Sequence, residues 1–339
     1  MEPQESMPDE TPTSLSAETP RRLWDSLARV LTRTRRNMAF QDWLALGFHL
    51  AMWIRVEATV DSYDALMGRR AALGLVAVTV VMLLLTRGEV LSRGFARTLV
   101  YRLGICLPTF LSYFELHFVL PALRPHLLDL QLLAIDNAIF GVSPSVWLDQ
   151  FVTPGTTEWF AIFYYSYFYI AAAYLVSAVF VDKDARRIGE LMAGATVVVF
   201  GTHLGYTLVP GMGPHATLAF DHPLVGGFWW HLVASTVAKS GAQLDIFPSL
   251  HTGFPSLFLL HAIRHRRATP FAIGWPVTAF FVGNIIIATL FLRWHWGIDV
   301  LVGLTLAFIG HRVGVAVSAR EIDREKADRQ AVWEPFAVT

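Results

Sequence analysis

Cysteine and charged residues are both scarce in this chain of 339 residues. Its single cysteine, Cys106, excludes an intramolecular disulfide, a thiolate zinc cluster and an iron–sulfur site. Charged residues make up only 16% of the sequence, whereas soluble domains usually carry roughly 25%. Lys+Arg and Asp+Glu are balanced at 27 each, so the chain lacks the overall basic surface that is typical of nucleic-acid-binding proteins. These absences argue against a soluble protein and against a nucleic-acid partner.

Long apolar segments take the place of the missing charge. Hydrophobic residues make up 54% of the chain, and its mean hydropathy is +0.46. A helix that spans a bilayer needs roughly 20 mostly apolar residues. The sequence predicts up to eight such segments, the first of them interrupted by charges: 42–60, 71–86, 98–120, 157–181, 188–209, 247–263, 270–292 and 298–317. We therefore expect an all-α integral membrane protein, a polytopic bundle of six to eight transmembrane helices.

Lys and Arg gather in short clusters between these segments, and most clusters fall on one side of the membrane if every segment spans it. The positive-inside rule then predicts that both termini are cytoplasmic. The first apolar segment comes too late for a signal peptide, so none is expected. The lone cysteine and the lack of a signal peptide fit a bacterial inner membrane, and an internal eukaryotic membrane is the alternative.

Composition divides the chain into five regions. We expect a disordered acidic tail at 1–20, a basic amphipathic juxtamembrane helix at 21–40, additional membrane helices at 41–97, the main membrane domain at 98–317 and a cytoplasmic tail at 318–339. Within the main domain, an amphipathic stretch contains Asp129, Asp136 and Asp149 among apolar residues. This pattern predicts a segment that lies along the membrane interface.

Two histidines are expected to meet on the non-cytoplasmic face. His251 follows Pro248 and Ser249, residue types that suit a helix start, and His295 lies 44 residues further on, after two crossings. Asp299 is four residues after His295, so the two share one side of a helical turn. Such a carboxylate can orient an imidazole nucleophile, and a second histidine can protonate the leaving oxygen. The set suits phosphoryl transfer through a phosphohistidine, which requires no metal or other cofactor.

Both histidine motifs resemble those of the type 2 phosphatidic acid phosphatase superfamily. Pro248-Ser249-Leu250-His251 resembles its second motif, and His295-x-x-x-Asp299 resembles its third. The surrounding segments are most similar to the branch that contains inositol phosphorylceramide synthases: 136–141, 164–168 and 209–214. The resemblance covers about residues 100–315. It implies a core six-helix fold, His295 as nucleophile, Asp299 as its orienting carboxylate, His251 as general acid, no metal ion, and a phospholipid-type substrate that enters from the bilayer.

The chain departs from the phosphatase branch where that branch binds phosphate. The first motif is present only as His117-x6-Arg124-Pro125, with histidine in place of lysine, and Thr289 replaces the arginine expected before the third motif. Arg293 could supply this charge or could anchor its helix at the headgroups. The substrate-binding candidates are Arg293, Ser249, His117, Arg124, Tyr167, His203 and Tyr206. The loop histidines His215, His222 and His231 match no zinc-site spacing, so we predict no metal site.

These features predict a membrane lipid phosphotransferase. A lipid donor would pass a phosphate-containing group to an alcohol, sugar or lipid acceptor, as the resemblance to inositol phosphorylceramide synthases implies. If water is the acceptor, the protein is a lipid phosphate phosphatase. A transporter or scaffold on the same fold is the non-catalytic alternative, and a metal-dependent lipid hydrolase is a further one.

Overall fold

A computed structural model describes residues 15–123, 126–321 and 323–336, and every regular element in these ranges is a helix. The longer helices are α1 (Leu15–Asn37), α2 (Phe40–Glu57), α3 (Tyr63–Thr86), α4 (Phe95–Ala122), α7 (Pro154–Val176), α8 (Ala185–Leu208), α11 (Leu250–Arg264), α12 (Phe271–Phe291) and α13 (Gly297–Glu321). The shorter ones are α5 (Asp129–Phe140), α6 (Pro144–Asp149), α9 (Pro214–Thr217), α10 (Phe228–Lys239), the π-helical turn Ser177–Val181 and the 3₁₀ turn Glu325–Ala327.

Six of these helices are long and apolar enough to cross a membrane: Tyr63–Thr86, Phe95–Ala122, Pro154–Val181, Ala185–Leu208, Phe271–Phe291 and Gly297–Glu321. This confirms the prediction of an all-helical membrane protein. The two other predicted spans, 42–60 and 247–263, coincide with α2 and α11. α11 has only 15 residues, which at 1.5 Å per residue is shorter than the roughly 30 Å of a bilayer core.

The N-terminal regions can be compared with these bounds. The basic helix expected at 21–40 overlaps α1, which begins at Leu15. Residues 1–14 of the expected acidic tail lie outside the described residues. α3 begins at Tyr63, eight residues before the predicted span, because Ser62 caps it by accepting a hydrogen bond from the Ala65 amide.

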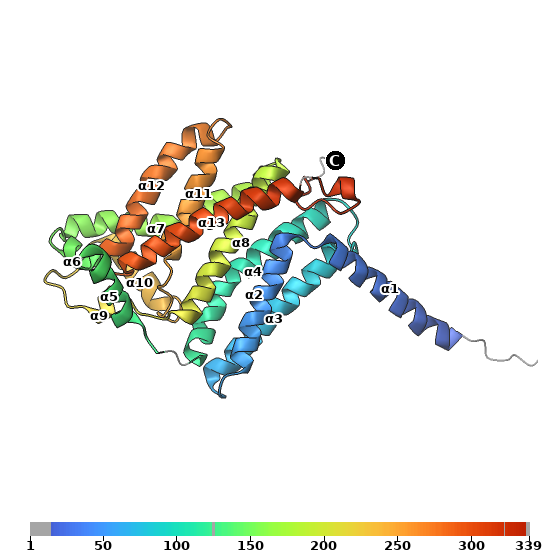
Figure 1. Cartoon of the computed structure of the whole chain (residues 1–339), viewed down its shortest axis with the longest axis horizontal. Coiled ribbons are helices and arrows are strands. Elements are labelled where there is room, and N and C mark those ends of the chain that lie inside the picture. Colours follow the sequence, from blue (N-terminus) through green and yellow to red (C-terminus); the bar gives the residue numbers. More distant parts are fainter. Residues whose placement is uncertain (1–14, 124–125, 322, 337–339) are drawn as a thin grey trace, which may run out of the picture.

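Helix α8 lies at the centre of the bundle. It packs against α11 and α13 on one side and against α2 and α4 on the other. Figure 1 shows α5, α6, α9 and α10 at the left end of the molecule, whereas α1 and the end of α13 lie to the right. The short helices therefore gather at one end of the bundle, beside the start of α13.

Glycines allow α11 and α13 to approach each other closely. A Cβ atom added at Gly303 would lie 2.6 Å from the Ser249 carbonyl oxygen, and one at Gly253 would lie 2.9 Å from the Gly303 carbonyl oxygen. Small residues let helix backbones pack tightly in membranes. This contact fixes the start of α11, which carries His251, against the start of α13, which carries Asp299.

Candidate active site

The His251 ring is held by aromatic stacking. Ser249 caps α11, and its side chain accepts a hydrogen bond from the Thr252 amide at 3.2 Å. His251 therefore lies in the first turn, where its imidazole stacks between two rings of α7. The centroid distances are 4.3 Å to Tyr164 and 4.1 Å to Tyr167. The tyrosines thus fix the orientation of a ring whose Nδ1 has no hydrogen-bond partner among the described residues.

His295 lies in the turn between α12 and α13, and its Nδ1 faces two acceptors. The Ile246 carbonyl oxygen is at 2.9 Å and Oδ2 of Asp299 is at 3.3 Å. Because both are acceptors, Nδ1 carries the hydrogen, which leaves Nε2 with a lone pair. Nε2 makes no hydrogen bond within the part of the chain that the structure describes. The carbonyl is the nearer partner, so the ring is held by two acceptors, whereas the family resemblance implied Asp299 alone.

The two imidazoles lie close together, as two helical crossings and a short turn would place them. Their ring centroids are 6.4 Å apart, with an angle of 44° between the planes. The Ser249 amide donates to the Asp299 carbonyl oxygen at 3.1 Å and so joins the starts of α11 and α13. A phosphorus atom bound between the rings could contact one histidine as a nucleophile and bring its leaving oxygen to the other.

Carboxylates from the amphipathic segment hold the turn that carries His295. Asp136 on α5 accepts hydrogen bonds from the Gly297 and Ile298 amides, both at 2.8 Å. It thereby satisfies the free amides at the start of α13, the role that an N-cap residue usually fills. Asp129 accepts one from Nε1 of Trp296 at 3.1 Å. These side chains therefore position the turn from its C-terminal side.

A third carboxylate, Asp149 on α6, fixes the N-terminal side of the turn through Arg293. The Arg293 guanidinium is 2.6 Å from Oδ1 of Asp149 and lies over the Phe220 ring at 3.9 Å from its centroid. Burial would raise the pKa of Asp149, but its hydrogen bond to His222 and the charge of Arg293 outweigh this and lower it. Arg293 has a φ of 66°, and its guanidinium contacts Asp149, the His222 carbonyl oxygen and the Phe220 ring.

Some of the remaining substrate-binding candidates lie beside His251, and others make their contacts elsewhere. Tyr167 contacts His251, and Ser249 starts its helix. His203 accepts or donates one hydrogen bond with the Ser112 hydroxyl at 2.9 Å, and its ring lies 5.8 Å from that of Tyr206. His117 is exposed and pairs with the Gly241 carbonyl oxygen at 2.8 Å. Arg124 lies outside the described residues.

One acidic residue near the site was missed by the sequence analysis. Asp245 lies in the loop between α10 and α11, one residue before Ile246, whose carbonyl oxygen holds His295. It is the only charged residue in the segment 240–249. The sequence signal for Asp245 was its isolation: it is an acidic residue in an otherwise uncharged loop, four residues before Ser249.

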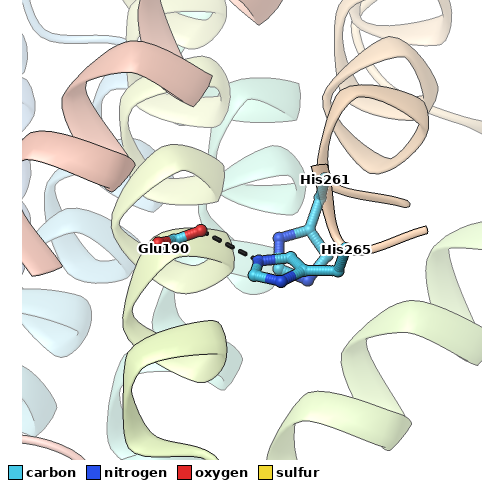
Figure 2. Close-up of side chains that lie close together, drawn as sticks. All are labelled: Glu190, His261 and His265. Atoms are coloured by element: carbon cyan, nitrogen blue, oxygen red, sulfur yellow. Dashed lines mark hydrogen bonds and ion pairs between the residues drawn. The ribbon is translucent and has the colours of Figure 1, made fainter. Parts of the chain in front are cut away.

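A second polar cluster lies at the other end of α11. Glu190 of α8 and the histidines His261 and His265 each offer a possible ligand atom, all within 4.8 Å of one another (Figure 2). The Glu190 carboxylate also pairs with Arg264 at 2.7 Å and with Arg186 at 3.2 Å. A divalent cation here would lie beside two guanidinium groups, so we interpret the cluster as an ion-pair network that joins α8 to α11.

Comparison with known proteins gives a family match. A family model of the PAP2 superfamily matches residues 130–313, just over half of the chain. No curated protein and no solved structure matches the chain. The matched segment begins in α5 and ends in α13, so it contains both histidines, Asp299 and the three carboxylates at 136, 149 and 245, and it leaves α1–α4 outside.

Proposed function

Since the chain belongs to the PAP2 superfamily, whose members are lipid phosphatases and phosphotransferases, we propose that it transfers a phosphate-containing group from a membrane lipid through a phosphohistidine at His295. The observation that carries this proposal is the pair of imidazoles 6.4 Å apart. One of them has its Nδ1 hydrogen bonded to two acceptors, so its Nε2 is available as a nucleophile.

The reaction has two balanced steps. In the first, Nε2 of His295 forms a bond to phosphorus while the bond from phosphorus to the leaving oxygen breaks, and protonated His251 donates its proton to that oxygen. Asp299 stabilises the positive charge that develops on the His295 ring. In the second step, the oxygen of an acceptor hydroxyl bonds to phosphorus, the phosphorus–nitrogen bond breaks, and His251 takes the acceptor proton.

The buried position of the nucleophile supports an alcohol acceptor over water. The His295 side chain is only 5% exposed, and His251 is covered on both faces by tyrosine rings. Such shielding limits hydrolysis of a reactive intermediate. We therefore propose a phosphotransferase similar to inositol phosphorylceramide synthases, with a polyol, sugar or ceramide-like acceptor and with phosphatase activity as the alternative.

The proposal includes an orientation in the membrane. The two histidines lie near the start of α11, opposite to Arg264, and α1 and the loop after α3, which carry arginine clusters, lie toward the end of α13 (Figure 1). By the positive-inside rule, the C-terminus is cytoplasmic and the histidines face the periplasmic or lumenal side. The bacterial inner membrane is the proposed location.

The test uses purified protein in liposomes with EDTA. Phospholipid and polyprenyl phosphate donors are supplied with and without inositol, glycerol and ceramide, and products are followed by lipid mass spectrometry. We expect a new phosphodiester lipid whose formation EDTA does not diminish. Free phosphate formed without acceptor dependence would identify a phosphatase, and loss of activity in EDTA would indicate a metal-dependent hydrolase.

The close contact of α11 and α13 yields a prediction for Gly303→Ala. The new methyl group would press on the Ser249 carbonyl oxygen, so the helix starts must separate and His251 must move relative to His295. Misplacement by about 1 Å can cost on the order of 10²-fold in rate, and we expect a loss of that size in kcat. The matched control is Gly283→Ala on α12, where an added Cβ meets nothing within 4 Å. Equal activity of the two variants would contradict the prediction.

A further inference from the structure

The end of the bundle opposite to the two histidines carries a pocket that the proposed reaction does not use. It has a volume of about 460 Å³ and adjoins a smaller cavity of about 10 Å³, with Arg97 and Glu334 lining both. The walls come from the end of α1, the loop after α3, the start of α4 and the segment 323–336. All of these lie outside the matched segment 130–313. The 25 residues of α13, which span about 37 Å at 1.5 Å per residue, separate the pocket from His295.

Arginine side chains dominate the lining of this pocket. The wider part is lined by Arg33, Arg36, Arg93, Arg97 and Arg329. The smaller cavity adds Arg87 and Arg102. Three carboxylates line the same surface, and each pairs with an arginine: Glu89, Asp328 and Glu334. Asp42, which pairs with Arg87 at 2.7 Å, supplies a fourth negative charge. Guanidinium groups remain in excess, so the pocket favours an anion.

Three side chains that line the smaller cavity have buried donor atoms without acceptors. Arg87 is 1% exposed and donates through Nε to Asp42, but its Nη2 has no hydrogen-bond partner among the described residues. Arg102, equally buried, donates to the carbonyl oxygens of Val179 and Glu334, both at 2.8 Å, and its Nε has no partner there. The buried Thr98 hydroxyl also has none. Because buried donors without acceptors are unfavourable, this cavity suits a ligand rich in acceptor atoms.

Phosphate has the acceptor geometry and the charge that these donors require. The parallel N–H groups of a guanidinium match two phosphate oxygens. The smaller cavity holds about one atom of the size of a water molecule, so one phosphate oxygen can enter it while the rest of the ligand stays in the wider pocket. Gln330 lines both parts, and its Oε1, which has no partner among the described residues, can accept a hydrogen bond from a hydroxyl of the same ligand.

We propose that Arg87, Arg102 and Thr98 form a phosphate-binding site at the end of the bundle that the proposed orientation places in the cytoplasm. The inference does not depend on the reaction at His295. Two sources share this chemistry: the headgroup of an anionic phospholipid and a soluble phosphate compound.

Helix α1 connects the pocket to the membrane surface. Its exposed apolar side chains recur at intervals of four residues, at Leu23, Leu27 and Leu31, and so form one face. A basic helix with such a face lies in the headgroup layer of an anionic leaflet. Arg33 and Arg36, which line the pocket, follow this face at the end of α1. The pocket is therefore within reach of phospholipid headgroups.

The test follows hydrogen exchange of residues 326–336 with the full chain in phosphatidylcholine nanodiscs. The lipid arm adds phosphatidylglycerol, and the soluble arm adds inorganic phosphate and is compared with chloride at equal ionic strength. A ligand that holds this segment must leave before the amides exchange, so a ligand concentration ten times Kd should slow exchange roughly tenfold. The arm that shows this protection identifies the source, and protection in both arms indicates that the phosphate group is sufficient.

Two variants locate the effect in the pocket. Thr98→Val removes a donor that has no partner in the described protein and should lower the protection severalfold. Its matched control is Thr79→Val on α3, another buried hydroxyl without a partner among the described residues, which should behave like the wild type. Glu334→Gln removes a carboxylate from the lining and should raise the affinity severalfold, whereas Asp25→Asn, an exposed position of α1, should not.

The protection is taken for each variant as the ratio of exchange rates without and with ligand, so a change in the segment itself cancels. Thr98→Val decides the matter if Glu334→Gln no longer holds the segment in place. No protection in either arm, or equal protection in Thr98→Val and Thr79→Val, would overturn the inference. Both results leave the proposed function intact, because they are obtained without measuring turnover.

Discussion

Replacing His295 with alanine is expected to reduce phosphoryl transfer by a factor on the order of 10⁴ or more, since loss of a covalent nucleophile has effects of this size. The variant removes the nitrogen that bonds to phosphorus. The side chain is almost fully buried and its Nδ1 is already hydrogen bonded, and the other imidazole of the site, His251, has its ring centroid 6.4 Å away and its plane inclined by 44°. Activity is measured as lipid product formed from a labelled donor.

Trapping the intermediate makes this prediction specific. With a donor labelled at phosphorus and a quench during turnover, the wild type should carry label that is stable in base and labile in acid, the behaviour of a phosphorus–nitrogen bond. His295→Ala should carry none, whereas His231→Ala, which removes an exposed histidine of α10, should label like the wild type. Label retained by His295→Ala would assign the nucleophile to another residue.

Replacing His251 with glutamine is expected to have an effect that depends on the leaving group. Glutamine can hydrogen bond but cannot transfer a proton at neutral pH, and general acid catalysis contributes about 10²- to 10⁴-fold. With a natural substrate, whose leaving group is an alkoxide, the variant should therefore lose activity by about that factor. With a nitrophenyl phosphodiester, whose leaving group needs no proton, the variant should lose much less activity. The two substrates are compared by kcat/KM for wild type and variant.

The stacking of His251 between Tyr164 and Tyr167 suggests another explanation for a loss of activity, a purely structural role. The comparison of the two leaving groups tests it. If the imidazole served mainly to fill the space between the two rings, the variant would lose activity equally with both leaving groups. Equal losses would therefore assign His251 a structural role. A thermal unfolding measurement in detergent shows whether the packing itself has changed.

The membrane fold could be predicted from the sequence because the bilayer limits the possible structures. Backbone groups in hydrocarbon must be satisfied within each helix, so long apolar segments such as 98–120 and 188–209 indicate helices directly. The ends of the helices were harder to predict than their centres, because polar residues can be accommodated at the membrane surface. Asp64, Arg69 and Arg70 lie in the first turns of α3, which explains why the predicted span began at 71.

The site could be predicted only in part, because its supports come from distant segments. The order of crossings was enough to place His251 and His295 on one face. The partners of Asp136, however, are backbone amides about 160 residues away in the sequence. Every residue except proline has a backbone amide, so no residue type indicates such a partner. The partner of Arg293 could not be predicted either, because it too lies in a distant segment. Its residue type predicted either phosphate binding or an anchor at the headgroups, and its ion pair with Asp149 is seen only in three dimensions.

The three aspartates of α5 and α6 also bear on the order in which the protein is made. Residues 129–149 leave the ribosome well before residues 293–298, and at about 5–20 residues per second the interval is on the order of ten to thirty seconds. During that time the carboxylates at 136 and 149 lack the amides and the guanidinium that later hold them. The turn that carries His295 therefore completes the interfacial segment as much as that segment supports the turn. A chain whose synthesis stops before residue 293 would leave Asp136 and Asp149 without these partners and expose the segment to proteases.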